Sequence, residues 1–290
     1  MANFEIKKVI IPVAGFGTRF LPATKAQPKE MLPIVDKPVI QYLVEEAVAS
    51  GIKEIIFVTG RGKRAIEDHF DNAAELEYFL EKRGKHELAR QIRKISSLAN
   101  FAFVRQKEPL GNGDALLQAL HLIKDEPVAV LFGDDVVYSK TPCLKQLIVA
   151  FKKHKASIFA LERVSKELVY KYGIVDAKRI ADRTYRIKKV VEKPAVKDAP
   201  SDLSIVGKYI LTPNVFYELS RLKYKKGKEL ELTQAFEKLL EKGEKIYGYE
   251  FDGTRYDCGD KLGLLKAVVD FGLRHPDVGK GLREHLRKVS

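Results

Sequence analysis

The sequence predicts an α/β fold: a Rossmann-like, three-layer architecture with a mostly parallel, mixed central sheet, a small β extension and C-terminal helices. Short apolar runs such as residues 9–13 (VIIPV) and 54–59 (EIIFVT) have the length of buried strands, and segments of helical periodicity separate them. This alternation is typical of βαβ units, whose parallel strands carry helices on both faces. In the second half, strand-like runs lie close together, which predicts the β extension.

The first half alternates between the two periods. Residues 38–50 are expected to form a helix because Ile40, Leu43, Val44 and Ala47 fall on one face, and Gly51 stops it. A long, charged helical excursion is expected over residues 63–98, and a further helix over 113–123. The predicted strands of this half are residues 9–13, 54–59, 101–105 and 128–132.

The second half is expected to add strands at residues 157–161, 173–177, 185–192 and 205–211, then helices at 231–241 and 261–274. No internal repeat or obvious linker divides the chain. We therefore expect one domain over residues 1–290, in which residues 262–290 form a C-terminal helical arm.

Composition narrows the class of protein. The 290 residues carry a formal charge of +13, which suggests an anionic partner. The basic residues are dispersed, apart from a cluster at Lys223, Lys225, Lys226 and Lys228, and they do not alternate with aromatic residues as in strand-binding surfaces. We expect no nucleic-acid partner, and a gel shift at physiological salt would test that alternative.

The chain shows no sign of a membrane or secreted protein. No apolar run approaches the roughly 20 residues of a membrane helix, and MANFEIKK leads directly into the first strand without room for a signal peptide. We expect a cytoplasmic protein without membrane contact. Cys143 and Cys258 have no ligand-like spacing, so both are interpreted as buried, reduced thiols.

A constrained, cationic segment follows the first strand: PVAGFGTRFLPATKAQPKEMLP, residues 12–33. Ligands of open parallel sheets bind beyond the carboxyl ends of strands. Gly15 and Gly17 allow close backbone approach, while Arg19 and Lys29 supply charge for phosphate oxygens. Neither the G-x-G-x-x-G fingerprint nor the Walker P-loop fits. The segment predicts a phosphate loop, and a crossover without a ligand is the alternative.

This segment resembles the nucleotidyltransferases that join NTPs to sugar 1-phosphates. The string AGFGTRFLPATKAQPKEMLPIVDKPVIQY is similar in particular to the bacterial-type UTP–glucose-1-phosphate uridylyltransferases. Further matching strings cover essentially the whole chain: VRQKEPLGNGDAL, EKP, SDLSIVGKYIL, ELELTQAF and YDCGDKLGLLKAVVDFGLRHP. The resemblance implies the nucleotidyltransferase fold.

The resemblance implies a reaction in which glucose 1-phosphate attacks the α-phosphorus of UTP, giving UDP-glucose and pyrophosphate. Such a transfer needs in-line positioning and charge neutralisation. Arg19 and Lys29 are then expected to bind the triphosphate and steady the leaving pyrophosphate. Mg²⁺ is the implied cofactor, with Asp134 as its ligand and Asp257 as the best candidate for a second. Capping of turns is the alternative role for both carboxylates.

The resemblance also assigns the base and the sugar. Gln106, whose amide offers a donor and an acceptor to a uracil edge, is expected to bind the base. Glu192 is expected to accept glucose hydroxyls, and Lys193 to meet the phosphate of glucose 1-phosphate. The remaining expected nucleotide contacts are Ala14, Gly15, Gly17, Thr18, Pro109 and Gly111, and the remaining sugar contacts are Gly173 and Gly207.

The chain departs from its relatives in two motifs: GLGHA, where Asn112 and Asp114 differ, and LTDA, where Gln234 differs. Asp114 stands where they commonly have histidine in GLGHA, and Gln234 stands where they have aspartate in LTDA. Both bear on sugar preference and on the choice of uracil over thymine. A thymidylyltransferase or an enzyme accepting both bases is therefore the alternative within the class, and a non-catalytic nucleotide-sugar sensor the alternative outside it. Relatives are commonly dimers or tetramers, so a homo-oligomer is expected.

Overall fold

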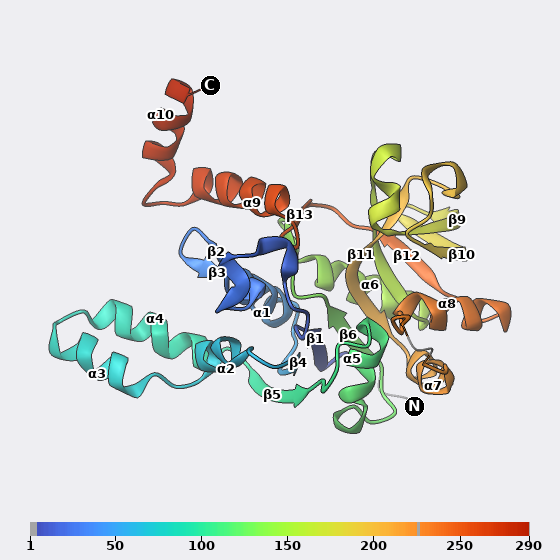
Figure 1. Cartoon of the computed structure of the whole chain (residues 1–290), viewed down its shortest axis with the longest axis horizontal. Coiled ribbons are helices and arrows are strands. Elements are labelled where there is room, and N and C mark those ends of the chain that lie inside the picture. The colour runs from blue at the N-terminus through green and yellow to red at the C-terminus, as the bar shows by residue number, and fades with distance from the viewer. Residues whose placement is uncertain (1–4, 225–226, 290) are drawn as a thin grey trace.

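A computed structural model describes residues 5–224 and 227–289 (Figure 1). Lys225 and Lys226 of the predicted lysine cluster, and the first four residues, lie outside the described residues. Within them, nine strands form one mixed sheet in the order β5-β4-β1-β6-β11-β8-β12-β10-β9. Their bounds are β1 Lys8–Pro12, β4 Glu54–Thr59, β5 Asn100–Arg105, β6 Val128–Leu131, β8 Ile158–Arg163, β9 Gly173–Ala181, β10 Thr184–Glu192, β11 Leu203–Leu211 and β12 Tyr247–Glu250.

Two small ladders lie beside this sheet. Strands β7 (Asp135–Tyr138) and β13 (Thr254–Asp257) pair antiparallel, with Asp135 opposite Asp257. Strands β2 (Pro33–Ile34) and β3 (Lys37–Pro38) form the other. The helices are α1 Val39–Ala49, α2 Arg64–Phe70, α3 Ala74–Lys82, α4 His86–Ser96, α5 Asn112–Gln118, α6 Cys143–His154, α7 Pro213–Arg221, α8 Leu232–Glu241, α9 Lys261–Arg274 and α10 Gly279–Val289.

The order of strands places a switch point between β1 and β6. From β1 the chain moves outward through β4 to β5, and it then returns to the opposite side of β1 as β6, with all four strands parallel. The carboxyl ends of β1 and β6 therefore flank a crevice, which is where open α/β sheets bind ligands. The predicted phosphate loop and Gly133–Asp134 follow these two ends.

Alternation along the central strands creates a core on each face of the sheet. In β1, Val9 and Ile11 pack with helices α1 and α6, whereas Ile10 packs with α5, α7 and α8 on the other face. All three side chains are fully buried, and each contributes about 1.5–3 kcal/mol of hydrophobic stabilisation. Three layers result, with helices on both faces of the sheet (Figure 1).

Two elements extend away from these layers. The α3–α4 hairpin projects at one edge, and the C-terminal helices α9 and α10 project at another (Figure 1). Helix α9 is attached by a third apolar cluster, in which Ala267 packs with Ile34, Val136 and Tyr256. Across the described residues, we find no helix with the length and apolar character needed to cross a membrane.

The predicted α/β fold is confirmed, and the strand 54–59 and the helix 261–274 match their observed bounds. The predicted helical excursion at 63–98 consists of three helices, α2, α3 and α4. The prediction lacked α6, α7, β12 and the β7–β13 ladder. Cys143 and Cys258 are both buried and free, as interpreted from the sequence.

Candidate active site

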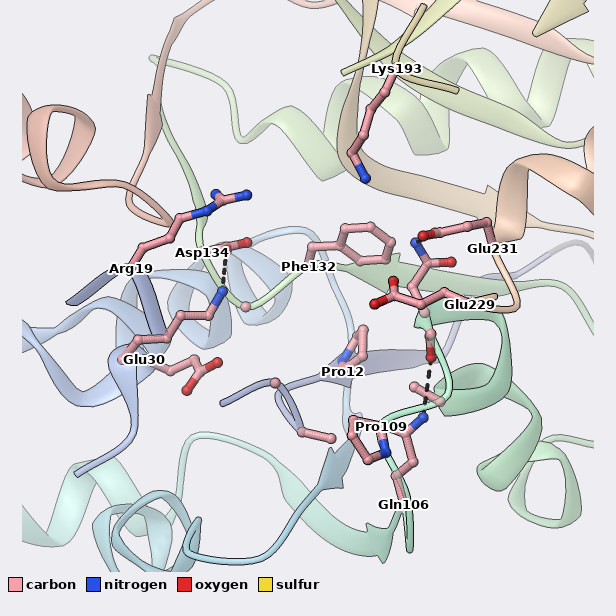
Figure 2. A pocket seen from close by; sticks show the side chains of 17 residues that line it. Pro12, Arg19, Glu30, Gln106, Pro109, Phe132, Asp134, Lys193, Glu229 and Glu231 are labelled. Atoms are coloured by element: carbon pink, nitrogen blue, oxygen red, sulfur yellow. Dashed lines mark hydrogen bonds and ion pairs between the residues drawn. The ribbon is translucent and has the colours of Figure 1, made fainter. Parts of the chain in front are cut away.

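A cavity of about 380 Å³ opens at the switch point (Figure 2). Its walls come from the loops after β1, β5, β6 and β10 and from the segment before α8. The lining residues are Pro12, Ala14, Gly15, Arg19, Lys29, Glu30, Gln106, Pro109, Gly111, Asn112, Ala115, Phe132, Gly133, Asp134, Lys193, Glu229 and Glu231.

The cavity brings together many of the predicted site residues, although they come from distant parts of the chain. The lining includes Ala14, Gly15, Arg19, Lys29, Gln106, Pro109, Gly111, Asp134 and Lys193. The remaining predicted residues, Gly17, Thr18, Gly173, Glu192, Gly207 and Asp257, lie outside the lining. The roles predicted for all of these residues stay predictions.

The loop after β1 folds back on itself because Gly17 adopts a left-handed conformation, with φ +67°. A Cβ at this position would lie 3.1 Å from Cβ of Lys29, so glycine allows the two segments to approach closely. The Thr24 hydroxyl donates to the Gly17 carbonyl at 2.8 Å and closes the turn. Arg19 is exposed, and its Nη1 donates to the carbonyl of Gly259 at 3.4 Å.

An ion pair joins this loop to the end of β6. Lys29 Nζ lies 2.5 Å from Asp134 Oδ2. Burial opposes the charged form of Lys29, but Asp134 and Glu30 outweigh it and hold the lysine pKa above its ordinary value. Burial likewise opposes the charged form of Asp134, and Lys29 outweighs it and lowers the carboxylate pKa. A charged pair is therefore established before any anionic ligand binds.

Asp134 and Asp257 converge over Gly259. A Cβ at Gly259 would lie 2.5 Å from Asp134 Oδ2 and 2.9 Å from Asp257 Oδ1, so the missing side chain leaves space that both carboxylates face. The Gly259 N–H donates to Asp257 Oδ1 at 3.0 Å. Burial, followed by repulsion from Asp135, raises the pKa of Asp257. Two carboxylates at such a space fit a hard divalent cation that takes its other ligands from substrate.

A divalent cation held by Asp134 and Asp257 would need further ligands from outside this pair. In the described part of the chain, no group of three or more His, Cys, Asp and Glu side chains is placed to hold a metal ion. One or two carboxylates completed by phosphate oxygens and water are typical of Mg²⁺ sites.

Sequence reasoning missed Arg255, which lies at the centre of the carboxylates behind the cavity. Its Nε donates to Asp135 Oδ1 at 2.5 Å, and its Nη2 lies 3.8 Å from Asp257 Oδ2. The guanidinium also lies 4.8 Å from the centre of the Tyr172 ring. Burial opposes its charge, but Asp135, Asp257 and Glu162 together outweigh burial and raise the pKa of Arg255. Period-two alternation along β13 could have indicated that Arg255 and Asp257 share a face.

The opposite end of the cavity is built around Gln106, which follows β5 and is 6% exposed. Its Nε2 donates to the Gly111 carbonyl at 3.2 Å and to Asp114 Oδ2 at 2.7 Å. Both N–H groups are thus used within the chain. The expectation that this amide contacts a base stays a prediction, and in this structure its two N–H groups already have partners within the chain. Gly111 has φ +113°, and a Cβ there would collide with the backbone of Leu230.

The end of β10 supplies Glu192 and Lys193, whose side chains form an ion pair at 3.1 Å. Lys193 has φ +45°, which is rare for a residue with a side chain and often marks a functional constraint. Gly173 lies beside Glu192, because a Cβ there would be 3.3 Å from Glu192 Oε2. Their position at a strand end brings these residues together. Their predicted contacts with sugar stay predictions.

Gly207 has a packing reason for being glycine. It is buried in β11, its N–H donates to Asp135 Oδ2 at 3.0 Å, and its carbonyl accepts from the Phe132 N–H at 2.7 Å. A Cβ would also meet the Phe132 side chain at 2.7 Å. Its backbone groups are used within the chain, and its predicted contact with sugar stays a prediction.

The sequence model of the nucleotidyl transferase family matches residues 8–272 of this chain. This match spans the switch-point loops, Gly133–Asp134 and the β13 carboxylate.

The chain belongs to the nucleotidyl transferase family.

Curated relatives of this nucleotidyl transferase agree over nearly the full length. It is 48% identical to UTP–glucose-1-phosphate uridylyltransferase 1 of Staphylococcus saprophyticus over 286 residues, 99% of each chain. It is 49% identical to the UTP–glucose-1-phosphate uridylyltransferase of Bacillus subtilis over 282 residues, 97% of this chain and 95% of the relative. The resemblance inferred from the sequence is confirmed.

Solved structures confirm the predicted nucleotidyltransferase fold. A UDP-glucose pyrophosphorylase complexed with UDP-glucose has a TM-score of 0.84 and 43% identity, covering 93% of this chain and 100% of that one. A UTP-bound UGPase from Acinetobacter baumannii has a TM-score of 0.90 and 38% identity, covering 99% of this chain and 100% of that one.

Three glutamates of this nucleotidyl transferase gather around Lys193, and the sequence reasoning identified only Glu192. Glu229 and Glu231 line the cavity just before α8 (Figure 2). Asn112 donates through Nδ2 to Glu231. Burial, followed by repulsion from Glu192, raises the pKa of Glu231 to about 7. The available signal was the acidic string Glu229-Leu-Glu231 ahead of a predicted helix, which reads equally well as solvated surface.

Proposed function

We propose that this nucleotidyl transferase transfers the uridylyl group of UTP to glucose 1-phosphate, giving UDP-glucose and pyrophosphate. The observation that carries the proposal is the pairing of Lys29 with Asp134 beside Arg19, in a cavity at the sheet's switch point. The nearly full-length relatives named for this activity support it. Two mutually repelling anions must meet in such a reaction, and fixed opposite charges lower the barrier.

Atoms and charges balance in a single displacement. A phosphate oxygen of glucose 1-phosphate forms a bond to the α-phosphorus of UTP. The bond from that phosphorus to the bridging oxygen of the β-phosphate breaks, and pyrophosphate leaves with the electron pair. Arg19 and Lys29 bind the triphosphate and stabilise the leaving group, and Lys193 holds the phosphate of glucose 1-phosphate. Their work is orientation and charge stabilisation.

Nucleotidyl transferases of this family generally use divalent metal ions, and we propose Mg²⁺ here. Asp134 and Asp257 would hold it, since both face the space over Gly259. When bound, the ion supplies charge neutralisation on the phosphates.

Product analysis tests the proposal directly. Turnover is measured by mass spectrometry with UTP or dTTP at fixed glucose 1-phosphate, with Mg²⁺ and with a chelator in its place. We expect UDP-glucose from UTP, and loss of product with the chelator. The thymidylyltransferase alternative is not favoured, because the relatives are named for uridylyl transfer. Faster turnover with dTTP would overturn the choice of base, and binding of UTP without any product would favour a nucleotide-sugar sensor.

Assembly into a homo-oligomer and a cytoplasmic location remain proposals. The C-terminal arm supports the first, because Leu262, Leu265 and Val278 are exposed on it. Light scattering on the full chain, and on a variant with these three residues changed to Ser, tests the arm. A dimeric or larger mass that falls in the variant is expected, and a monomeric wild type would refute oligomerisation.

A further inference from the structure

The amide of Gln106 is held in one orientation by two partners that only accept hydrogen bonds. A glutamine amide carries two N–H donors on Nε2 and an acceptor oxygen, Oε1. Here Nε2 donates to the carbonyl of Gly111 and to the carboxylate of Asp114. Rotating the amide by 180° would set Oε1 against two oxygens and leave the buried groups unpaired, which is costly at a side chain 6% exposed.

Asp114 is itself held in place. It lies in the first turn of α5, and Gln118 on the same helix donates through Nε2 to its Oδ1 at 3.2 Å. Oδ2 is thereby left for Gln106 at 2.7 Å. The carbonyl of Gly111 is fixed as well, because this residue packs against the backbone of Leu230 with φ +113°. The orientation of Gln106 therefore depends on a chain of contacts from Gln118 through Asp114.

This arrangement leaves Oε1 as the group that Gln106 offers to a ligand. Uracil presents an N–H donor at N3, whereas cytosine presents a lone pair at the same position. An acceptor oxygen pairs with the first and repels the second. Sites built around one buried hydrogen bond reject analogues that cannot make it far more strongly than apolar pockets reject a methyl group. Thymine shares the N3–H group of uracil and would not be rejected in this way.

We propose that Asp114 is a positioning residue, which fixes the Gln106 amide with Oε1 toward the base and so favours a uracil or thymine nucleotide over a cytosine nucleotide. The inference rests on the proposed function, since it concerns the base of the same nucleotide. It assigns a role to a position at which this chain departs from its relatives.

The test compares kcat/KM for UTP and for CTP in the wild type and in Asp114→Asn. Asparagine both donates and accepts, so the Gln106 amide becomes free to turn. We expect the UTP-to-CTP ratio to fall at least 10-fold, mainly through KM, while kcat with UTP stays within about threefold because the phosphate side is untouched. Asp114→Glu, which keeps an acceptor-only group, should retain more of the ratio.

Glu108→Gln is the matched control, because Glu108 is an exposed acid on the same loop and its substitution removes the same charge. Its ratio should stay at the wild-type value. An equal fall in both variants, or an unchanged ratio in Asp114→Asn, would overturn the proposal. A thermal melt establishes that each variant is folded. If Asp114→Asn is not, Asp114→Ser, whose hydroxyl donates and accepts, replaces it with the same expectation.

Failure of the inference and failure of the proposed function give different results. A wild type that makes no UDP-glucose from UTP refutes the function. A wild type that makes it, combined with an unchanged ratio in the variant, refutes only the role of Asp114.

Discussion

The two sides of the cavity differ in how their charged side chains are paired (Figure 2). On the side of the β1 loop, which we call the paired side, Lys29 and Asp134 neutralise each other at 2.5 Å, and Lys63 pairs with the buried Glu30 at 2.8 Å. On the side of α8, which we call the acidic side, Glu229 and Glu231 lie in the cavity wall with Lys193, and the pKa of Glu231 is raised to about 7. Paired charges are held in a defined geometry, whereas crowded like charges make their own side less stable.

This contrast separates two physical requirements of the proposed reaction. The paired side, where the phosphates are proposed to bind, must present charge in fixed positions before the substrates arrive, since reorganisation during the reaction would add to the barrier. The acidic side, where the sugar is proposed to bind, must offer acceptors to hydroxyl groups, and carboxylates do this at the expense of folding stability. Proteins commonly accept such local conflicts at functional sites.

The largest effect is expected from substituting Arg255, the cation that offsets the repulsion among the carboxylates behind the cavity. Arg255→Met leaves Asp135, Asp257 and Glu162, whose Oε2 lies 3.5 Å from Arg255 Nη1, without their shared partner. We expect the free energy of unfolding to fall by about 3 kcal/mol or more, as for other broken buried ion pairs. Urea denaturation measures it.

Arg179→Met is the control, because Arg179 forms a surface pair with Asp182 at 3.0 Å. Its substitution should change the free energy of unfolding by no more than about 1 kcal/mol. Equal losses in the two variants would mean that the paired side is no more dependent on its charges than the surface.

Asp134→Ala tests the paired side by activity. The substitution removes the partner of Lys29 and one of the two carboxylates that face the space over Gly259. We expect kcat to fall by about a hundredfold or more, the size associated with loss of one electrostatic contact to the reacting groups, while the circular dichroism spectrum is retained. Asp198→Ala, an exposed acid, should keep wild-type kcat. Full activity in Asp134→Ala would refute the metal assignment.

Lys193→Met tests the lysine of the acidic side. Its Nζ is 3.1 Å from Glu192, and its pKa is raised by that carboxylate despite the opposing effect of burial. We expect the KM for glucose 1-phosphate to rise about 10-fold, the value of one charged contact, with the KM for UTP changed far less. Lys197→Met, at an exposed lysine nearby, is the control. A larger change for UTP than for the sugar phosphate would reverse the assignment.

Titration of Glu231 should produce the smallest effect. Its pKa is raised from the ordinary 4.5 to about 7 by burial and by Glu192, so the folded state binds the extra proton between these values. The contribution of Glu231 to the free energy of unfolding is therefore fully present below pH 4.5 and is lost as the pH rises through about 7. We expect a loss of about 1–2 kcal/mol in all, reduced by the part of the side chain that stays in water.

The measurement is the free energy of unfolding from pH 5 to pH 8 in the wild type and in Glu231→Gln. The variant should show a flatter profile over this window, and Glu284→Gln, at an exposed glutamate of α10, should keep the wild-type slope. A profile in Glu231→Gln as steep as that of the wild type would locate the titrating group elsewhere.

Local pattern was sufficient for part of this site. Lys29 and Asp134 follow strands with clear apolar runs, and parallel neighbours bring their carboxyl ends to one edge. The position of Arg255 depends on the β7–β13 ladder, in which Asp135 pairs with Asp257 across the chain. Each strand of this ladder has four residues, so alternation within one strand does not indicate which strand it pairs with. The pairing is a property of the folded chain.

The acidic side was predictable only in part for a related reason. Glu192 was predicted because the motif that contains it resembles the family, whereas the pKa of Glu231 depends on burial and on Glu192 in the folded chain. The orientation of the Gln106 amide likewise depends on the carboxylate of Asp114 at 2.7 Å. Residue type indicated what these groups can do, and tertiary contacts decide which of those abilities remain.

A crystal structure with bound UDP-glucose tests most directly whether the paired side receives the phosphates and the acidic side the sugar. We predict the diphosphate within hydrogen-bonding distance of Arg19 or Lys29, the glucose ring beside Glu192, and the uracil N3–H group at Oε1 of Gln106. A diphosphate bound away from the β1 loop, or a ligand lying in the reverse direction across the cavity, would contradict this account.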